Sequence, residues 1–236
     1  MCTKKQLVKM LDNRHPYISV VIPTLNEGKN IGKAISGVKL MLKDYRYEIL
    51  VVDKHSTDNT VSVSKAQGAR TLYEDKGKGF ALIKGFKEAK GKIIISMDAD
   101  LSHRPNELKL LIAAIEAGYD ICMGSRFLIG GGSDDMPLFR KLGNKAFVLL
   151  VNAIYRANYT DLCYGYRSMN REAFKKVHLT SNGFGIETEI SIKAKKAGLK
   201  IIEVPSYEKK RTYGVGKLRS FSDGYAILKT IFGNIR

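Results

Sequence analysis

Asp98 and Asp100 lie one residue apart, directly after the apolar run at 93–97. In an extended chain, residues two apart point to the same side, so the two carboxylates share one small space. Like charges this close raise each other's pKa unless a cation lies nearby. Oxygen ligands without His or Cys at metal-binding spacing favour a hard ion, Mg²⁺ or Mn²⁺. The pair alone leaves a second interpretation open, in which both acids belong to a solvated turn or a helix cap.

Two further apolar runs also end in polar residues. Pro23 and Glu27 follow the first run, and Asp53 follows the second. Ligands of an open parallel sheet bind at the carboxyl ends of its strands, where these residues would gather. We therefore expect one site at that edge.

The elements that must position this site alternate in kind along residues 17–124. Apolar runs rich in β-branched residues predict strands, and segments of helical period between them predict helices. The strands are expected at 18–22, 48–52, 69–73, 93–97 and 120–123, and the helices at 29–42, 58–67, 79–89 and 105–117. Ser56 or Thr57 is the expected cap of the second helix. This rhythm indicates an α/β fold with a Rossmann-like, mostly parallel sheet and helices on both faces.

The second half of the chain follows a different pattern. A Gly-rich loop at 130–135 leads to an expected helix at 140–155, a strand near 164–169, a helix at 186–197 and a strand at 199–204. No linker composition separates the halves, so we expect this part to complete the same domain.

Composition limits the class of protein. The chain has 236 residues, 44% of them hydrophobic, which is enough for one sizeable core. Its formal net charge of +17 predicts an anionic partner: nucleic acid, acidic lipid or a phosphorylated small molecule. The apolar run at 147–155 is shorter than the roughly 18 to 20 residues that span a bilayer. An odd number of cysteines argues against a disulfide framework, which fits a cytoplasmic location.

Eight segments in order carry a resemblance. They read VVIPTLNEGKNI at 20–31, EILVVDKHSTDNT at 48–60, GKGFALIKGFKEAKG at 77–91, MDADLSH at 97–103, GSRF at 124–127, DLCYGYRSMNREAF at 161–174, GFGIETEI at 183–190 and KRTYGVGKL at 210–218. Together they resemble the family 2 glycosyltransferases with the GT-A fold, and within them the polyprenyl (dolichyl) phosphate sugar transferases.

The resemblance implies an inverting, metal-dependent sugar transfer from a UDP- or GDP-linked donor to a polyprenyl or dolichyl phosphate. It implies that Asp98 and Asp100 hold Mg²⁺ or Mn²⁺ on the donor diphosphate. The residues that it assigns to donor binding are Pro23, Glu27, Asp53, Lys78 and Asp98. A cation held there would stabilise the charge that develops on a departing nucleoside diphosphate.

The acceptor side is expected to be cationic, because a lipid phosphate is already anionic and needs positioning more than a general base. The resemblance points to Arg126, Arg211 and Lys217 as catalytic residues. Arg140 and Arg167 stand at similar loop positions. Arginine forks suit bidentate phosphate contacts, although each of these cations has a simpler interpretation as a solvated surface charge.

Asp161 falls where the family carries an acid near the acceptor, and we assign it a base or orienting role; the alternative is a turn acid that pairs with an arginine. Glu187 and Glu189 begin a predicted helix, where the helix dipole alone would favour them.

Three positions depart from the family pattern. Lys54 replaces a frequent second acid, Ser102 replaces an amide side chain, and Gly216 replaces a serine before Lys217. These departures put base recognition, one metal ligand and one phosphate contact in doubt, and they leave open a homologue that binds without turnover.

We divide the chain into an N-terminal arm or short helix at 1–16, a GT-A domain at 17–219 and a C-terminal amphipathic helix at 220–236. That helix suits peripheral attachment to the cytoplasmic face of a membrane or packing on the protein's own core. A transfer to a saccharide or soluble hydroxyl is the alternative function. A basic nucleic-acid-binding protein is more remote, because no nucleic-acid-binding motif appears and we expect no nucleic acid partner.

Overall fold

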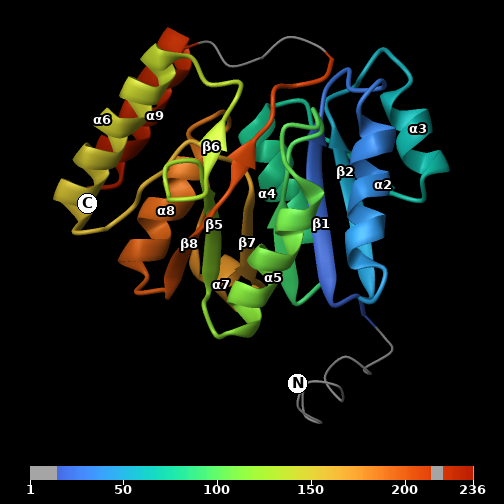
Figure 1. Ribbon diagram of the computed structural model, residues 1–236, viewed down its shortest axis with the longest axis horizontal. Coiled ribbons are helices and arrows are strands. Elements are labelled where there is room, and N and C mark those ends of the chain that lie inside the picture. The colour runs from blue at the N-terminus through green and yellow to red at the C-terminus, as the bar shows by residue number, and fades with distance from the viewer. Residues whose placement is uncertain (1–14, 214–219, 236) are drawn as a thin grey trace.

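A seven-stranded sheet forms the centre of the computed structural model, which describes residues 15–213 and 220–235 (Figure 1). The strand order is β3-β2-β1-β4-β7-β5-β8. The bounds are β1 (Ile18–Thr24), β2 (Tyr47–Asp53), β3 (Arg70–Tyr73), β4 (Ile93–Ser96), β5 (Ile121–Ser125), β7 (Arg167–Asn170) and β8 (Ile201–Pro205). All neighbouring pairs are parallel except those that β7 makes. The predicted α/β class and mostly parallel sheet are confirmed.

Helices cover both faces of the sheet and bury two apolar clusters. Their bounds are α2 (Ile31–Leu42), α3 (Thr60–Ala66), α4 (Lys78–Glu88), a 3-10 turn at Pro105–Glu107, α5 (Leu108–Glu116), α6 (Leu138–Tyr155), α7 (Arg171–Lys176), α8 (Ile186–Lys196) and α9 (Ser220–Gly233). One cluster gathers apolar side chains of α2 and α5, and the other those of α4, α8 and α9. Burial of these helix faces on strands that are apolar on both sides holds the layers together.

β7 is the element whose direction the sequence did not reveal. It runs antiparallel between β4 and β5, with Ser96 opposite Arg167 and Met123 opposite the same residue. The strand begins at 167 instead of near 164, because Tyr164 and Tyr166 pack around His103 before the ladder starts. Its first residue therefore lies at the edge where β4 and β5 end.

Two short strands were not expected. β6 (Gly132–Ser133) and β9 (Tyr207–Glu208) pair with each other beyond the ends of β5 and β8. They carry the Gly-rich loop and the basic segment to the carboxyl edge of the main sheet.

The expected cap of α3 is wrong. The helix begins at Thr60 with Asn59 before it. Ser56 instead gives its backbone N–H and its hydroxyl to Asp53, at 2.7 and 2.6 Å. Ser56 thus binds the buried carboxylate of Asp53 at the end of β2 instead of capping the helix as the local pattern had predicted.

Helices α6 and α9 lie side by side at one end of the molecule (Figure 1). Ile227 and Ile231 of α9 are buried in the core, whereas other large apolar side chains of the pair face solvent. These exposed residues form what we call the α6–α9 face: Leu138, Phe139, Leu142, Leu149, Tyr225, Leu228 and Phe232. Throughout the described ranges, every helix is too short or too polar to cross a bilayer.

Candidate active site

A cavity of about 740 Å³ opens at the carboxyl edge of the sheet. Eight of the residues predicted for the site line it: Pro23, Glu27, Lys78, Asp98, Asp100, Arg126, Arg140 and Arg211. Asp53 and Asp161 lie behind its wall, and Lys217 and Gly216 fall outside the described residues. One space thus brings together two of the predicted residues, Pro23 and Arg211, that are 188 positions apart in the sequence.

Lys78 is held at the start of α4 by a close backbone approach. Gly77 has a φ of 131°, and a Cβ there would lie 2.4 Å from the carbonyl oxygen of Asn182. A Cβ on Gly79 would lie 2.1 Å from the carbonyl oxygen of Ser181, and its N–H donates to Asn182. Only glycine on each side of Lys78 lets the loop at 181–182 pack this tightly.

Two cations balance the acid pair. Lys78 Nζ lies 2.9 Å from Asp98 Oδ1 and 3.1 Å from Glu187 Oε1. Arg211 Nη1 lies 3.5 Å from Asp100 Oδ2. Burial alone would raise the pKa of Asp98, but Lys78, with smaller help from His103 and Arg211, lowers that pKa to about 2. Asp98 is therefore ionised at neutral pH without a bound ion.

The acid pair fits a hard divalent ion that keeps open positions. Mg²⁺ and similar ions usually take one or two carboxylates and complete their shell with water and substrate phosphates. Asp98 and Asp100 supply such oxygens at the cavity wall, with side chains 31% and 16% exposed. Within the part of the chain that the structure describes, no cluster of three His, Cys, Asp or Glu side chains could enclose an ion unaided. The site thus suits an ion that arrives with an anionic ligand.

His103 supports the first acid. It is 2% exposed and stacks on Tyr166 with ring centroids 4.6 Å apart. Its Nδ1 accepts the Asp98 backbone N–H at 3.1 Å. Burial is the main cause of its lowered pKa, so the neutral imidazole acts as a packed support for the turn after β4.

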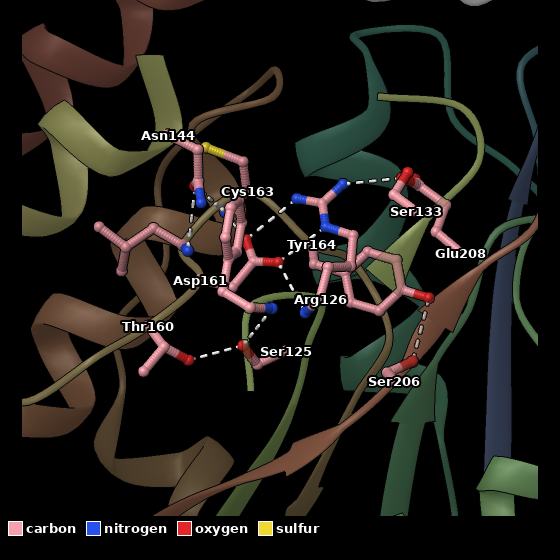
Figure 2. A network of polar contacts seen from close by, with 12 residues as sticks. Ser125, Arg126, Ser133, Asn144, Thr160, Asp161, Cys163, Tyr164, Ser206 and Glu208 are labelled. Atoms are coloured by element: carbon pink, nitrogen blue, oxygen red, sulfur yellow. Dashed lines mark hydrogen bonds and ion pairs between the residues drawn. The ribbon is translucent and has the colours of Figure 1, made fainter. Parts of the chain in front are cut away.

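Arg126 contacts two carboxylates, those of Asp161 and Glu208 (Figure 2). Its Nε and Nη2 donate to the two carboxylate oxygens of Asp161, at 2.7 and 3.0 Å, and its Nη1 lies 3.1 Å from Glu208. Burial would lower the pKa of Arg126, but Asp161 above all, followed by Glu208, raises it. Asp161 is fully buried and bound on both oxygens, so its geometry suits an orienting role.

Arg211 links the acid pair to the loop after β6. Its Nη2 and Nε donate to Asp135 Oδ2, at 2.9 and 3.1 Å. Burial tends to lower its pKa, but Asp135 and Asp100 raise it, so the guanidinium keeps its charge. Arg140, on α6, also lines the cavity.

Arg167 does not belong to this cationic set. It is 1% exposed, and its guanidinium donates to the carbonyl oxygens of Leu162, Tyr164 and Glu187. The sequence-based expectation of a loop cation at this position is wrong, because the residue opens β7 and faces the interior.

Glu187 and Glu189, both in the first turn of α8, have different roles: one lies in the site and the other is structural. Glu187 lines the cavity and pairs with Lys78, whereas Glu189 turns away and binds the loop at 180–181. Glu208, Asp135 and Asn144 also line the cavity, but sequence reasoning missed them. They lie on short strands, a loop and a helix whose placement depends on the whole fold.

Comparisons with known proteins identify similar sequences and structures. Residues 19–178 match the family model described as Glycosyl transferase family 2. A dolichol-phosphate mannosyltransferase from Pyrococcus furiosus is 37% identical over 93% of this chain, which spans 62% of that relative's length. A polyprenol monophosphomannose synthase from Mycolicibacterium smegmatis is 29% identical, covering 92% of this chain and 86% of the relative.

Among solved structures, glucosyl-3-phosphoglycerate synthase from Mycobacterium tuberculosis, in complex with Mn²⁺, UDP-glucose and phosphoglyceric acid, has the same fold. It superposes with a TM-score of 0.74 at 23% identity, covering 99% of this chain and 84% of that one.

Proposed function

Because this chain belongs to glycosyl transferase family 2, as the match over residues 19–178 shows, we propose that it transfers a sugar from a nucleoside diphosphate donor to a polyprenyl or dolichyl phosphate. One observation carries this proposal. A single cavity joins an acid pair suited to an ion and a diphosphate with a group of arginines suited to a second phosphate. The names of the mannosyltransferase and synthase relatives support the lipid phosphate as acceptor.

The donor side is assigned to the ends of β1, β2 and β4. Pro23 and Glu27 line the part of the cavity proposed for the base and ribose of UDP or GDP. Asp53 supports that wall, since it accepts hydrogen bonds from Thr24 and Ser56. Lys78 would bind the diphosphate, because an ammonium at the start of a helix suits phosphate oxygens.

Asp98 and Asp100 would hold Mg²⁺ or Mn²⁺, which when bound stabilises negative charge on the departing nucleoside diphosphate. The protein's own groups do the rest of the positioning. Lys78 carries its charge beside Asp98, and Arg211 carries a second charge beside Asp100.

The acceptor side is assigned to Arg126, Arg140 and Arg211, with Lys217 as a further candidate. The attacking phosphate oxygen is already anionic, so it forms the bond to the anomeric carbon as the bond to the diphosphate breaks, with inversion. No proton has to be removed. Asp161 therefore acts by holding the Arg126 fork in one orientation.

The α6–α9 face supports peripheral contact with a membrane. Phe139 and Arg140 belong to the start of α6 and also line the cavity. An apolar surface beside a cationic opening suits a bilayer in which the acceptor's polyprenyl tail stays buried while its phosphate enters the site.

The proposal is tested by measuring nucleoside diphosphate released from a panel of UDP- and GDP-sugars, with Mn²⁺ or Mg²⁺ present. Parallel reactions contain polyprenyl phosphate, simple glycosides or no acceptor. Release that requires the lipid phosphate supports the proposal. Release with glycosides alone would instead select a hydroxyl acceptor, and no release with any pair would contradict a transferase activity.

A further inference from the structure

Glu203 lies behind the acceptor side of the cavity, on β8, and does not line it. Its carboxylate accepts hydrogen bonds from three donors of the loop that precedes β7. Thr160 N lies 2.8 Å from Oε2, Thr160 Oγ1 lies 2.9 Å from the same oxygen, and Asp161 N lies 3.1 Å from Oε1. One half-buried carboxylate thus fixes the backbone that carries Asp161.

The same carboxylate also reaches the residues on either side of Arg126. Ser125 Oγ lies 2.6 Å from Thr160 Oγ1, and Phe127 N donates to Ser125 Oγ at 3.2 Å. Because Thr160 gives its hydroxyl proton to Glu203, Ser125 must be the donor to Thr160. The hydrogen bonds then run in one direction, from Phe127 through Ser125 and Thr160 to Glu203; Figure 2 shows the link between Ser125 and Thr160.

We propose that Glu203 is a positioning residue for the acceptor half of the site. It holds Asp161 through the backbone and holds both neighbours of Arg126 through the hydroxyl chain. Glu203 thereby fixes both the backbone that carries Arg126 and the carboxylate, Asp161, that binds its guanidinium. This inference rests on the proposed function, because it assigns the acceptor phosphate to Arg126.

A second glutamate makes similar contacts on the donor side and, unlike Glu203, also pairs with a lysine, with Lys193 Nζ 2.6 Å from its Oε1. Glu189 accepts the N–H groups of Thr180 and Ser181 and the hydroxyl of Thr180, at 3.0, 2.8 and 2.7 Å. The loop that it holds continues to Asn182, whose carbonyl accepts the N–H of Gly79 next to Lys78. The two glutamates therefore hold two different loops, one beside each proposed substrate.

This symmetry gives a matched pair of variants, E203Q and E189Q. Glutamine keeps the size of the side chain but offers one acceptor oxygen, and its NH₂ group would face backbone N–H donors. Each variant should loosen only its own loop. A general loss of stability would instead change the binding of donor and acceptor alike.

The experiment measures three quantities in each purified variant. They are the KM for polyprenyl phosphate, the Kd for Mn²⁺ with UDP or GDP, and amide hydrogen exchange at 160–163 and 180–182. We expect E203Q to raise the acceptor KM about tenfold, as for loss of hydrogen bonds to a charged group, with the nucleotide Kd nearly unchanged. Exchange should become faster at 160–163 alone. E189Q should show the reverse pattern.

A second pair of variants, T160V and T160S, is needed in case E203Q does not fold. T160V removes only the hydroxyl link and should raise the acceptor KM. T160S keeps the hydroxyl and should have the KM of the wild type. Equal effects on donor and acceptor in all variants, or an unchanged acceptor KM with normal exchange at 160–163, would overturn the inference. If the wild type releases no nucleoside diphosphate with any lipid phosphate, the proposed function fails; the local exchange pattern then decides separately whether Glu203 positions the loop.

Discussion

Lys78 and Asp98 form an ion pair, with Nζ 2.9 Å from Oδ1, in the position where a divalent ion would bind the first acid. An arriving ion would compete with Lys78 for that carboxylate. A bound diphosphate would remove this competition, because it would offer Lys78 new oxygen partners. The ion and the nucleotide should therefore bind together more tightly than either binds alone.

Replacement of Lys78 tests this coupling. K78M should bind Mn²⁺ alone more tightly than the wild type, because Asp98 loses its competing cation. It should bind UDP or GDP about tenfold or more weakly, since a hydrogen-bonded charge on the diphosphate is lost. Electron paramagnetic resonance reports free Mn²⁺, and calorimetry reports nucleotide binding. K87M, an exposed lysine on the same helix, is the matched control.

Replacement of either acid should remove turnover without unfolding the protein. D98N and D100N each keep the side-chain shape but lose the charge that holds the ion, and we expect at least a hundredfold fall in kcat, on the order of other losses of transition-state charge stabilisation. D44N, at an exposed acid beyond α2, should keep full activity. Nucleoside diphosphate release measures all three, and an active D100N would mean that the ion is placed wrongly.

Removal of Arg126 leaves Asp161 as a buried, unpaired charge. R126M should therefore lower the free energy of unfolding by about 3–5 kcal/mol. The double variant R126M/D161N should be more stable than R126M, because the unpaired charge is gone. Urea unfolding of the four combinations measures this coupling, and additive effects would contradict it.

The two loop-holding glutamates should respond to pH in opposite ways. Burial raises the pKa of Glu203 above its ordinary 4.5, and the charge of Asp161 adds to the effect, although hydrogen bonds from Thr160 and Asp161 oppose it. Burial would also raise the pKa of Glu189, but hydrogen bonds from Lys193, Ser181 and Thr180 lower it below 4.5.

The direction in which stability changes with pH depends on whether the folded or the unfolded state binds the glutamate's proton more tightly. For Glu203 the folded state does, so the stability advantage of wild type over E203Q is greatest below the ordinary pKa of 4.5 and shrinks as pH rises. For Glu189 the stability advantage of wild type over E189Q is complete above the ordinary pKa of 4.5. It is lost as pH falls below 4.5 and through the lowered pKa of the folded state. Thermal melts of both variants and the wild type from pH 3 to 8 should show the two trends; parallel curves would contradict them.

Membrane contact is tested on the exposed face instead of by deleting α9, because Ile227 and Ile231 of that helix are part of the core. L142S/L149S should reduce flotation with anionic liposomes and leave the melting temperature nearly unchanged. L40S replaces a leucine that is 63% exposed on α2, and it should float like the wild type. Equal flotation of both variants would reject the α6–α9 face as the contact.

The first half of the fold was predictable because local pattern and tertiary position agree there. Each buried strand ends in its polar residue, so Asp98, Asp100 and Glu27 reached the expected edge. Positions that depend on distant partners were not predictable. Ser56 binds Asp53 instead of capping α3, and Arg167 turns inward because β7 is inserted antiparallel. The local sequence around Ser56 and Arg167 does not indicate which residues they contact.

The reversed strand has a further consequence for the distance between the two substrates. β7 starts where β4 ends, so the loop that supports Arg126 through Asp161 is joined by a hydrogen-bonded ladder to the strand that delivers Asp98. Adjacent strands lie about 4.8 Å apart and resist sliding past one another. In the proposed reaction, the distance between the acceptor phosphate and the donor diphosphate would therefore be set by the strands of a single sheet, and no hinge between lobes would be required to bring the two together.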